Sequence, residues 1–257
     1  MRLAAATLLS LLAIAAPAAA KTETATLGTV RAELSYVPHN SGPPTSMTLK
    51  VFDNEVQIVD TAIPDDNFWQ PVGYETDHKS VSVRDLDGDG TGEAIFDLFS
   101  GGAHCCSITY FYKGTTEIVK NWGNPGYVIR GGDLISEDDR FSYHFGSYAG
   151  SLRPLQVFQL TSDAKLTDVT GERPARVRKD AKRMRRYYRQ AVHALKKQPA
   201  YVELVKSSLG AFTADQCSLQ HCGKGYALAR RAIAKGYLKP AYLPHLKRFL
   251  RKLGYDR

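Results

Sequence analysis

Residues 80–99, with the sequence SVSVRDLDGDGTGEAIFDLF, place a short acidic loop between two apolar segments. The flanks Ser80–Val83 and Ala94–Phe99 are rich in β-branched and aromatic residues, which is typical of β-strands. Between them, Asp85–Glu93 combines aspartates at every second position with three glycines. The stretch therefore predicts one strand, a tight acidic loop and a second strand.

The spacing of the loop carboxylates predicts a calcium site. Counted from Asp85, they fall at relative positions 1, 3, 5 and 9. Alternate residues of a tight loop point their oxygens inward, and Ca²⁺ takes six to eight oxygen ligands. Gly90, at position 6, permits the sharp turn. The expected ligands of Ca²⁺ are Asp85, Asp87, Asp89, Thr91 through its carbonyl, and Glu93.

Two alternatives to this interpretation differ in structure and in chemistry. An EF-hand needs a bidentate Glu at position 12 and helices on both sides, whereas this loop has Phe96 there and strands as flanks. A plain acidic turn is the simpler alternative. In that case the loop carboxylates repel one another, because no cation neutralises them.

The chain up to residue 171 continues with short apolar segments separated by turns about every ten residues. Asp53-Asn54 and Lys113-Gly114 are the clearest turn signals. The other expected strands are Thr29–Val37, Met47–Phe52, Glu55–Ala62, Ser107–Tyr112, Thr115–Val119, Tyr127–Arg130, Arg140–Phe145 and Leu155–Leu160. This pattern favours an antiparallel sandwich or a partial propeller-like sheet.

After Pro174 the apolar residues recur every three or four positions, which indicates helices. The expected helices are Arg173–Lys197, Tyr201–Leu209, Tyr226–Lys235 and Tyr242–Leu253, with Gly236 as a C-terminal cap of the third. We therefore predict an α+β fold with an antiparallel β-rich domain over residues 21–171. A basic α-helical domain over residues 172–257 follows it.

The two predicted domains carry opposite charge. Residues 21–171 hold 11 Lys and Arg against 21 Asp and Glu, whereas residues 172–257 hold 22 against 5. Eleven of the basic residues lie between Arg173 and Lys197. They indicate either an anionic envelope polymer or membrane surface as partner, or a helix that is solvated or packed on the acidic domain. Nucleic acid is not an expected partner, because no recognised motif supports it.

The first twenty residues resemble a secretory signal peptide. Arg2 precedes an almost wholly apolar run, Leu3–Ala16, and Pro17–Ala20 supplies small residues for cleavage. The alternative is an uncleaved anchor, but the run is short for a membrane span. We expect a Sec-type signal peptide over residues 1–20, a secreted or periplasmic protein, and no transmembrane segment in the mature chain.

Four cysteines, Cys105, Cys106, Cys217 and Cys222, suggest disulfides in an oxidising compartment. Four cysteines allow three pairings. We favour 217–222 with 105–106, and the alternative links the C-terminal pair to the β half. His104 beside Cys105 invites a catalytic interpretation. However, adjacent residues of a strand point to opposite faces, which disfavours a nucleophile–base pair.

Asp85–Glu93 with its following strand resembles the calcium-binding repeat of FG-GAP/VCBS proteins, the units of integrin-type β-propellers. The run SGGAHCC at residues 100–106 resembles a subgroup of secreted bacterial proteins, mostly uncharacterised, that carry it after the loop. The resemblance extends from Ser80 to the helices after Pro174. In that subgroup a second acidic loop tends to precede a stretch like Asp138–Phe141. Here residues 131–137, GGDLISE, lack the alternating aspartates.

The resulting hypothesis is an exported calcium-binding protein of FG-GAP/VCBS type that acts as a non-enzymatic binding or cell-surface module. The alternative is an exported hydrolase with a site between the β and helical halves. No motif in the chain assigns a nucleophile, an acid or a base, so no catalytic residue is predicted.

Overall fold

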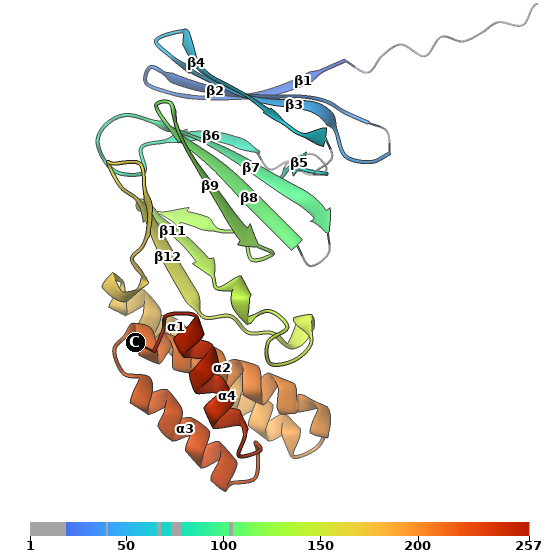
Figure 1. Cartoon of the computed structure of the whole chain (residues 1–257), viewed down its shortest axis with the longest axis vertical. Helices are drawn as coiled ribbons and strands as arrows, with labels where there is room; N and C mark the ends of the chain where they lie inside the picture. The colour runs from blue at the N-terminus through green and yellow to red at the C-terminus, as the bar shows by residue number, and fades with distance from the viewer. Residues whose placement is uncertain (1–18, 40, 66–67, 73–78, 103–104, 257) are drawn as a thin grey trace, which may run out of the picture.

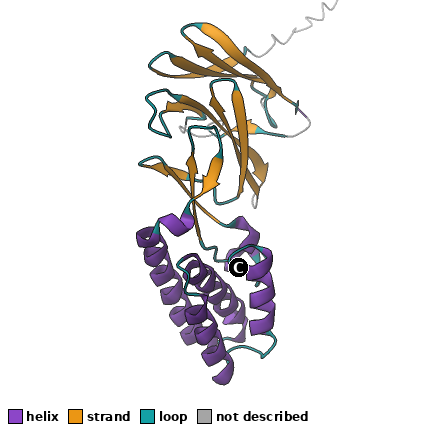
Figure 2. Ribbon diagram, turned by 60° about the vertical axis from the view of Figure 1, so that its left-hand side comes forward, coloured by secondary structure: helices purple, strands orange, loops and turns teal. Residues whose placement is uncertain are grey.

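The computed structural model describes residues 19–39, 41–65, 68–72, 79–102 and 105–256. Three antiparallel sheets follow one another along the chain, and four α-helices complete it (Figure 1). Strands and helices occupy separate halves of the molecule (Figure 2). The predicted α+β class is therefore confirmed. The predicted signal peptide lies outside the described residues, except for its last two positions.

Sheet 1 is an up-and-down meander at the N-terminal end of the molecule. Every second residue of its second strand is buried, because one face of the sheet covers a core and the other meets solvent. The third turn uses Asn54 and Glu55 in the left-handed conformation, one residue later than predicted. Its strands are β1 (Lys21–Leu27), β2 (Val30–Val37), β3 (Thr45–Asp53) and β4 (Val56–Ile63).

Sheet 2 lies in the middle of the stack and is buried on both faces. On β7, Phe96 packs in the core shared with sheet 1, while its neighbour Ile95 packs in the core shared with sheet 3. A strand buried on both faces is apolar without alternation, as residues 94–96 are. Its strands are β5 (Gln70–Pro71), β6 (Val81–Arg84), β7 (Glu93–Gly102), β8 (Cys105–Lys113) and β9 (Thr116–Gly123).

Sheet 3 contains β10 (Val128–Arg130), β11 (Asp133–Glu137), β12 (Leu155–Leu160) and β13 (Leu166–Asp168). The strand predicted over Arg140–Phe145 is wrong. A 3-10 turn, Asp139–Phe141, and a loop take its place. Phe141 and Phe145 lie in the hydrophobic core of the helices, so their aromatic character reflects helix packing rather than a strand.

The helices are α1 (Pro174–Leu195), α2 (Val202–Ser218), α3 (Cys222–Ala234) and α4 (Tyr242–Lys252). Helix α2 extends nine residues beyond its predicted end, and every residue from 207 to 217 is buried. It lacks an amphipathic pattern because the other helices and the loop after β11 cover it on all sides. Gly236, with φ +72°, ends the turn after α3 as predicted.

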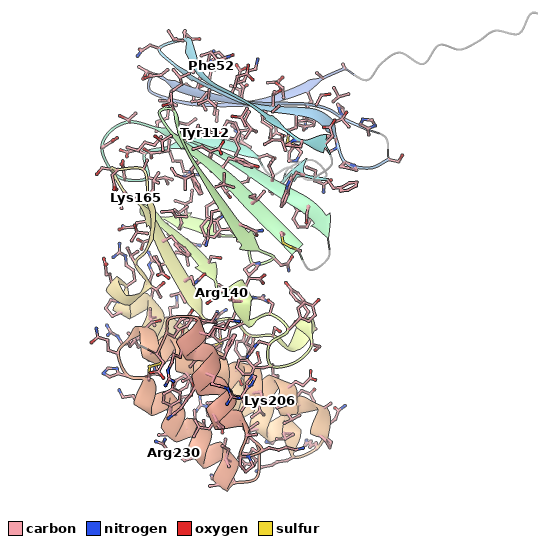
Figure 3. The ribbon with its side chains drawn as sticks, viewed as in Figure 1. Phe52, Tyr112, Arg140, Lys165, Lys206 and Arg230 are labelled. Atoms are coloured by element: carbon pink, nitrogen blue, oxygen red, sulfur yellow. A yellow bond between two sulfur atoms is a disulfide. The ribbon has the colours of Figure 1, made fainter. Side chains whose placement is uncertain are left out.

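Charged side chains join sheet 3 to the first helix. Asp133, which is 4% exposed, accepts hydrogen bonds from Arg173 Nε at 3.0 and 3.1 Å and lies 3.2 Å from Arg176 Nε. Arg183 donates to Glu137 at 2.8 Å. Arg140, at the level where sheet 3 meets the helices in Figure 3, pairs with a buried carboxylate of the same turn. Part of the basic charge of α1 is therefore neutralised within the protein.

Candidate metal site

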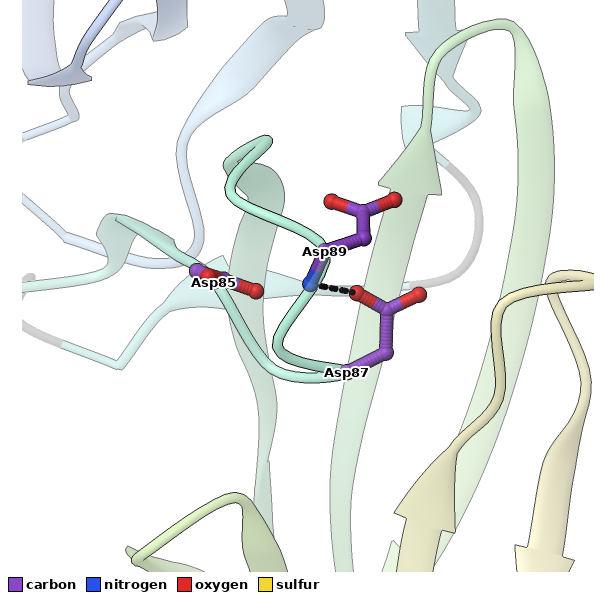
Figure 4. A group of neighbouring side chains, drawn as sticks. All are labelled: Asp85, Asp87 and Asp89. Atoms are coloured by element: carbon purple, nitrogen blue, oxygen red, sulfur yellow. Dashed lines mark hydrogen bonds between the residues drawn. The ribbon is translucent and has the colours of Figure 1, made fainter.

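The acidic loop connects β6 to β7 at one end of sheet 2, as predicted from its flanks (Figure 4). Gly88 and Gly90 have φ of +81° and +88°, which a residue with a side chain rarely adopts. The carboxylate of Asp85 accepts hydrogen bonds from the backbone N–H groups of both glycines, at 2.7 and 3.0 Å. These bonds hold the loop in a tight curve.

The curve gathers the aspartates on its inner side. Oxygens of Asp85, Asp87 and Asp89 lie within 4.8 Å of one another. Asp87 also accepts a hydrogen bond from the Asp89 N–H at 3.2 Å, drawn in Figure 4, and Asp89 accepts one from the Thr91 N–H at 2.7 Å. Asp87 and Asp89 thus each use one oxygen on the backbone of the loop and keep the other free of it, whereas both oxygens of Asp85 accept backbone hydrogen bonds.

Glu93 completes the acidic group from the first position of β7. Glu93 is fully buried, and its Oε2 atom accepts a hydrogen bond from the Leu86 N–H at 2.7 Å. Burial raises the pKa of the Glu93 carboxyl group. A buried carboxylate needs a positively charged or hydrogen-bonding partner for its second oxygen.

Lys113, the last residue of β8, supplies that partner. Its Nζ lies 2.7 Å from Asp87 Oδ2, 2.6 Å from Asp89 Oδ2 and 3.1 Å from Glu93 Oε1. Burial by itself would lower the pKa of Lys113, but the hydrogen bonds to these carboxylates outweigh it and raise that pKa. The hydrogen bond from Lys113 lowers the pKa of Asp89.

The loop residues fit a hard divalent cation, with Lys113 as its competitor. The loop carries four carboxylates, and the Lys113 ammonium pairs with three of them, so the loop retains an excess of negative charge. An ammonium ion and Ca²⁺ both take oxygen partners, but calcium prefers six to eight of them. To bind Asp87, Asp89 and Glu93 together, the metal would have to displace the Lys113 ammonium.

Sequence reasoning missed Lys113, although the strand pairing contains a signal for it. Ala94 of β7 pairs with Tyr112 of β8 in the antiparallel register. The residues that precede and follow this pair, Glu93 and Lys113, therefore meet at the end of the hairpin that carries the loop. Counting back through the hairpin would have placed a lysine next to the buried glutamate.

The other predicted sites lie apart from the acidic loop. The structure pairs Cys217 with Cys222, at the junction of α2 and α3, and Cys105 with Cys106 at the start of β8. His104 lies outside the described residues. Residues 131–132 form only a tight turn between β10 and β11, and the following Asp133 holds the arginines of α1.

A cavity of about 750 Å³ lies between the β and helical halves, where a hydrolase site was the alternative hypothesis. Its lining includes the Cys217–Cys222 disulfide and the side chains of Arg140 and Asp168. Asp168 accepts hydrogen bonds from the N–H and hydroxyl of Thr170, at 2.9 and 2.6 Å. Asp168 and Thr170 therefore already stabilise the turn that leads into α1.

Comparison with known proteins yields one partial relative. A probable thylakoid lumen protein from Synechocystis is 28% identical over 110 residues, covering 36% of this chain and 31% of the relative. The chain thus matches less than a third of the length of that protein. No protein-family model matches the chain, and no solved structure matches it. Among the described residues, no helix combines the length and apolarity needed to cross a membrane.

Proposed function

We propose that this protein is an exported, non-enzymatic binding module of the FG-GAP/VCBS type whose acidic loop binds Ca²⁺. The observation that carries the proposal is the gathering of Asp85, Asp87 and Asp89, whose carboxylate oxygens lie within 4.8 Å of one another, with the buried Glu93 linked to Asp87 and Asp89 through the Lys113 ammonium that they share. The proposed ligands are the carboxylates of Asp85, Asp87, Asp89 and Glu93, together with the carbonyl of Thr91.

The arrangement of the sheets supports the FG-GAP/VCBS part of the proposal. Sheets 1 and 3 are antiparallel meanders, β6 to β9 of sheet 2 form another, and neighbouring sheets pack face to face through their own core. Consecutive blades of a β-propeller have these same two properties. The acidic loop joins β6 to β7 in the middle sheet, where a bound ion would fix the start of β7 between two cores.

Export is supported by the apolar N-terminal run, by the two disulfides and by the partial relative. Disulfides persist in oxidising compartments outside the cytoplasm. The relative is described as a probable thylakoid lumen protein, and that compartment is reached by export across a membrane. Calcium is a sensible ligand in such compartments, because extracellular sites work at high calcium concentrations with modest affinity.

Thermal unfolding of the chelator-treated protein tests the calcium proposal. A ligand that binds only the folded state adds RT ln(1 + [L]/Kd), about 2.7 kcal/mol at a hundredfold excess over Kd. We therefore expect the melting temperature to rise with millimolar Ca²⁺, and to rise less with Mg²⁺, which prefers a smaller octahedral shell. Asp87→Ala should remove the response, whereas Asp163→Ala, on an exposed turn, should keep it.

A further inference from the structure

A groove on the helical half has a composition that the calcium proposal does not explain. It has a volume of about 590 Å³ and lies between α1 and α3, with the C-terminal part of α2 as its floor. This volume falls in the range of pockets that hold small organic ligands. The groove lies away from the acidic loop, because all its lining residues belong to residues 171–231.

The rim of this groove is strongly basic. Arg178, Lys182 and Arg185 follow one another along α1 at steps of four and three, so their side chains share one face of the helix. Lys224 and Arg231 of α3 line the opposite side. None of the lining residues is acidic, and within the described part of the chain none of these five cations forms an ion pair.

Some other arginines in or next to α1 differ from the groove cations, because they form ion pairs with carboxylates of the protein. Arg173 and Arg176 bind Asp133, and Arg183 binds Glu137 and Asp180. The arginines directed at sheet 3 are thus neutralised by the protein itself. The cations directed at the groove have no protein counter-ion among the described residues, so they are available to an anion that enters it.

The floor of the groove is largely apolar and includes one side-chain amide. Phe212 is 5% exposed, and Ala181 and Leu228 contribute further apolar surface. Gln216 is 8% exposed, and its side-chain amide makes no hydrogen bond to any described residue. Because this amide lines the groove, Gln216 offers a donor and an acceptor to a bound molecule.

We propose that the groove binds a small amphiphile that carries a phosphate group. The apolar body would cover Phe212 and Leu228, and the phosphate oxygens would bind the guanidinium groups of the rim. Arginine matches phosphate oxygens with two parallel hydrogen bonds. A phosphate monoester brings nearly two negative charges in one group, whereas a carboxylate brings one, so it suits five clustered cations better. A bare polyanion would leave the apolar floor uncovered.

Calorimetric titration with hexyl phosphate tests this proposal on the full-length protein. Two control titrations test the parts of the probe separately. Hexanol carries only the alkyl chain, and inorganic phosphate carries only the charged group. The groove variant is R178Q/R231Q, and the matched control is R186Q/R230Q, which removes the same charge from the same two helices outside the groove. Arg230 is labelled on α3 in Figure 3. Gln216→Leu changes the floor without changing the charge.

We expect saturable binding of one hexyl phosphate, with hexanol and inorganic phosphate each binding more weakly. The groove variant should raise Kd by more than about tenfold, the effect of losing charge-assisted hydrogen bonds, while the control stays near wild type. Gln216→Leu should also weaken binding. Absence of saturation in the millimolar range, or equal losses in both double variants, would overturn the proposal. If the protein binds phosphatidylglycerol vesicles but not hexyl phosphate, the partner of the basic helices is a membrane surface, and the proposal of a small ligand in the groove is wrong.

Discussion

The ammonium nitrogen of Lys113 lies 2.7 Å from Oδ2 of Asp87, within the acidic loop that the sequence marks for calcium. The side chain of Asp87 is 3% exposed and that of Lys113 is 16% exposed, so water screens the pair weakly. The lysine stands where a divalent cation would have to bind. In the proposed function, Lys113 and Ca²⁺ would therefore be alternative counter-ions for the same carboxylates.

Lys113→Met should lower the stability without calcium and should enlarge the stabilisation that calcium gives. Without calcium, the variant leaves Asp87 and Glu93 without their cation and should lose about 1–2 kcal/mol of unfolding free energy. With calcium, the competitor is absent, so the gain in melting temperature should exceed that of wild type. Urea unfolding with and without the metal measures both effects. Lys165→Met, which breaks an exposed pair, is the control and should change little.

Gly92→Ala should destabilise the protein through a steric clash. A Cβ at Gly92 would lie 2.6 Å from Val83 Cγ1 and 3.4 Å from Leu27, because the loop end packs tightly on β6 and β1. Overpacking of this kind costs about 1–3 kcal/mol, measured by urea unfolding. Gly223→Ala, at the start of α3 with no atom near its Cβ, should be neutral or slightly stabilising. Equal behaviour of the two variants would contradict the tight packing of the loop.

Asp133→Asn should loosen the junction between sheet 3 and α1. The side chain of Asp133 is 6% exposed and binds two arginines, so the amide would leave them without their counter-charge at a cost of about 2 kcal/mol. Chemical unfolding gives the loss. Asp60→Asn, which weakens a half-exposed pair at 3.6 Å, is the control. A change as small as that of the control would show that these ion pairs do not hold the junction.

The stability at low pH should depend on His144. Burial, and then the neighbouring His245, lowers the pKa of His144 to about 4, below the usual value near 6.5. The folded state therefore binds this proton less tightly than the unfolded state does. The contribution of the neutral ring is complete above pH 6.5 and is lost as the pH falls toward 4.

His144→Phe isolates this effect, because phenylalanine can preserve the stacking on Phe249 and does not titrate. The difference in melting temperature between wild type and variant should shift in favour of the variant between pH 6.5 and 4. A difference that stays constant over this interval would contradict the assignment.

The sequence predicts the fold class and the acidic loop well, because both depend on local patterns. Strand alternation and helical periodicity can be read within ten or twenty residues. The loop aspartates are close in sequence as well as in space. Helix α2 was predicted too short because its residues are buried on all sides, which removes the amphipathic pattern that marks a surface helix.

Features that depend on distant parts of the chain were missed. Phe141 and Phe145 looked like strand residues, but they fill the core of helices that begin more than twenty-five residues later. Lys113 reaches the acidic loop only through the pairing of β7 with β8. The division of the basic residues of α1 between sheet 3 and the groove likewise requires the packed structure.

Calorimetric titration of the chelator-treated protein with Ca²⁺ tests the central claim most directly. We predict saturable binding of one ion per chain in wild type, tighter binding in Lys113→Met, and loss of binding in Asp87→Asn. Tighter binding in Lys113→Met would identify the acidic loop as the site, since among the described residues the ion pairs of Lys113 are with the proposed ligands Asp87, Asp89 and Glu93. If neither wild type nor Lys113→Met binds Ca²⁺ up to the millimolar range, the calcium proposal is contradicted, and the loop is an acidic turn neutralised by its own lysine.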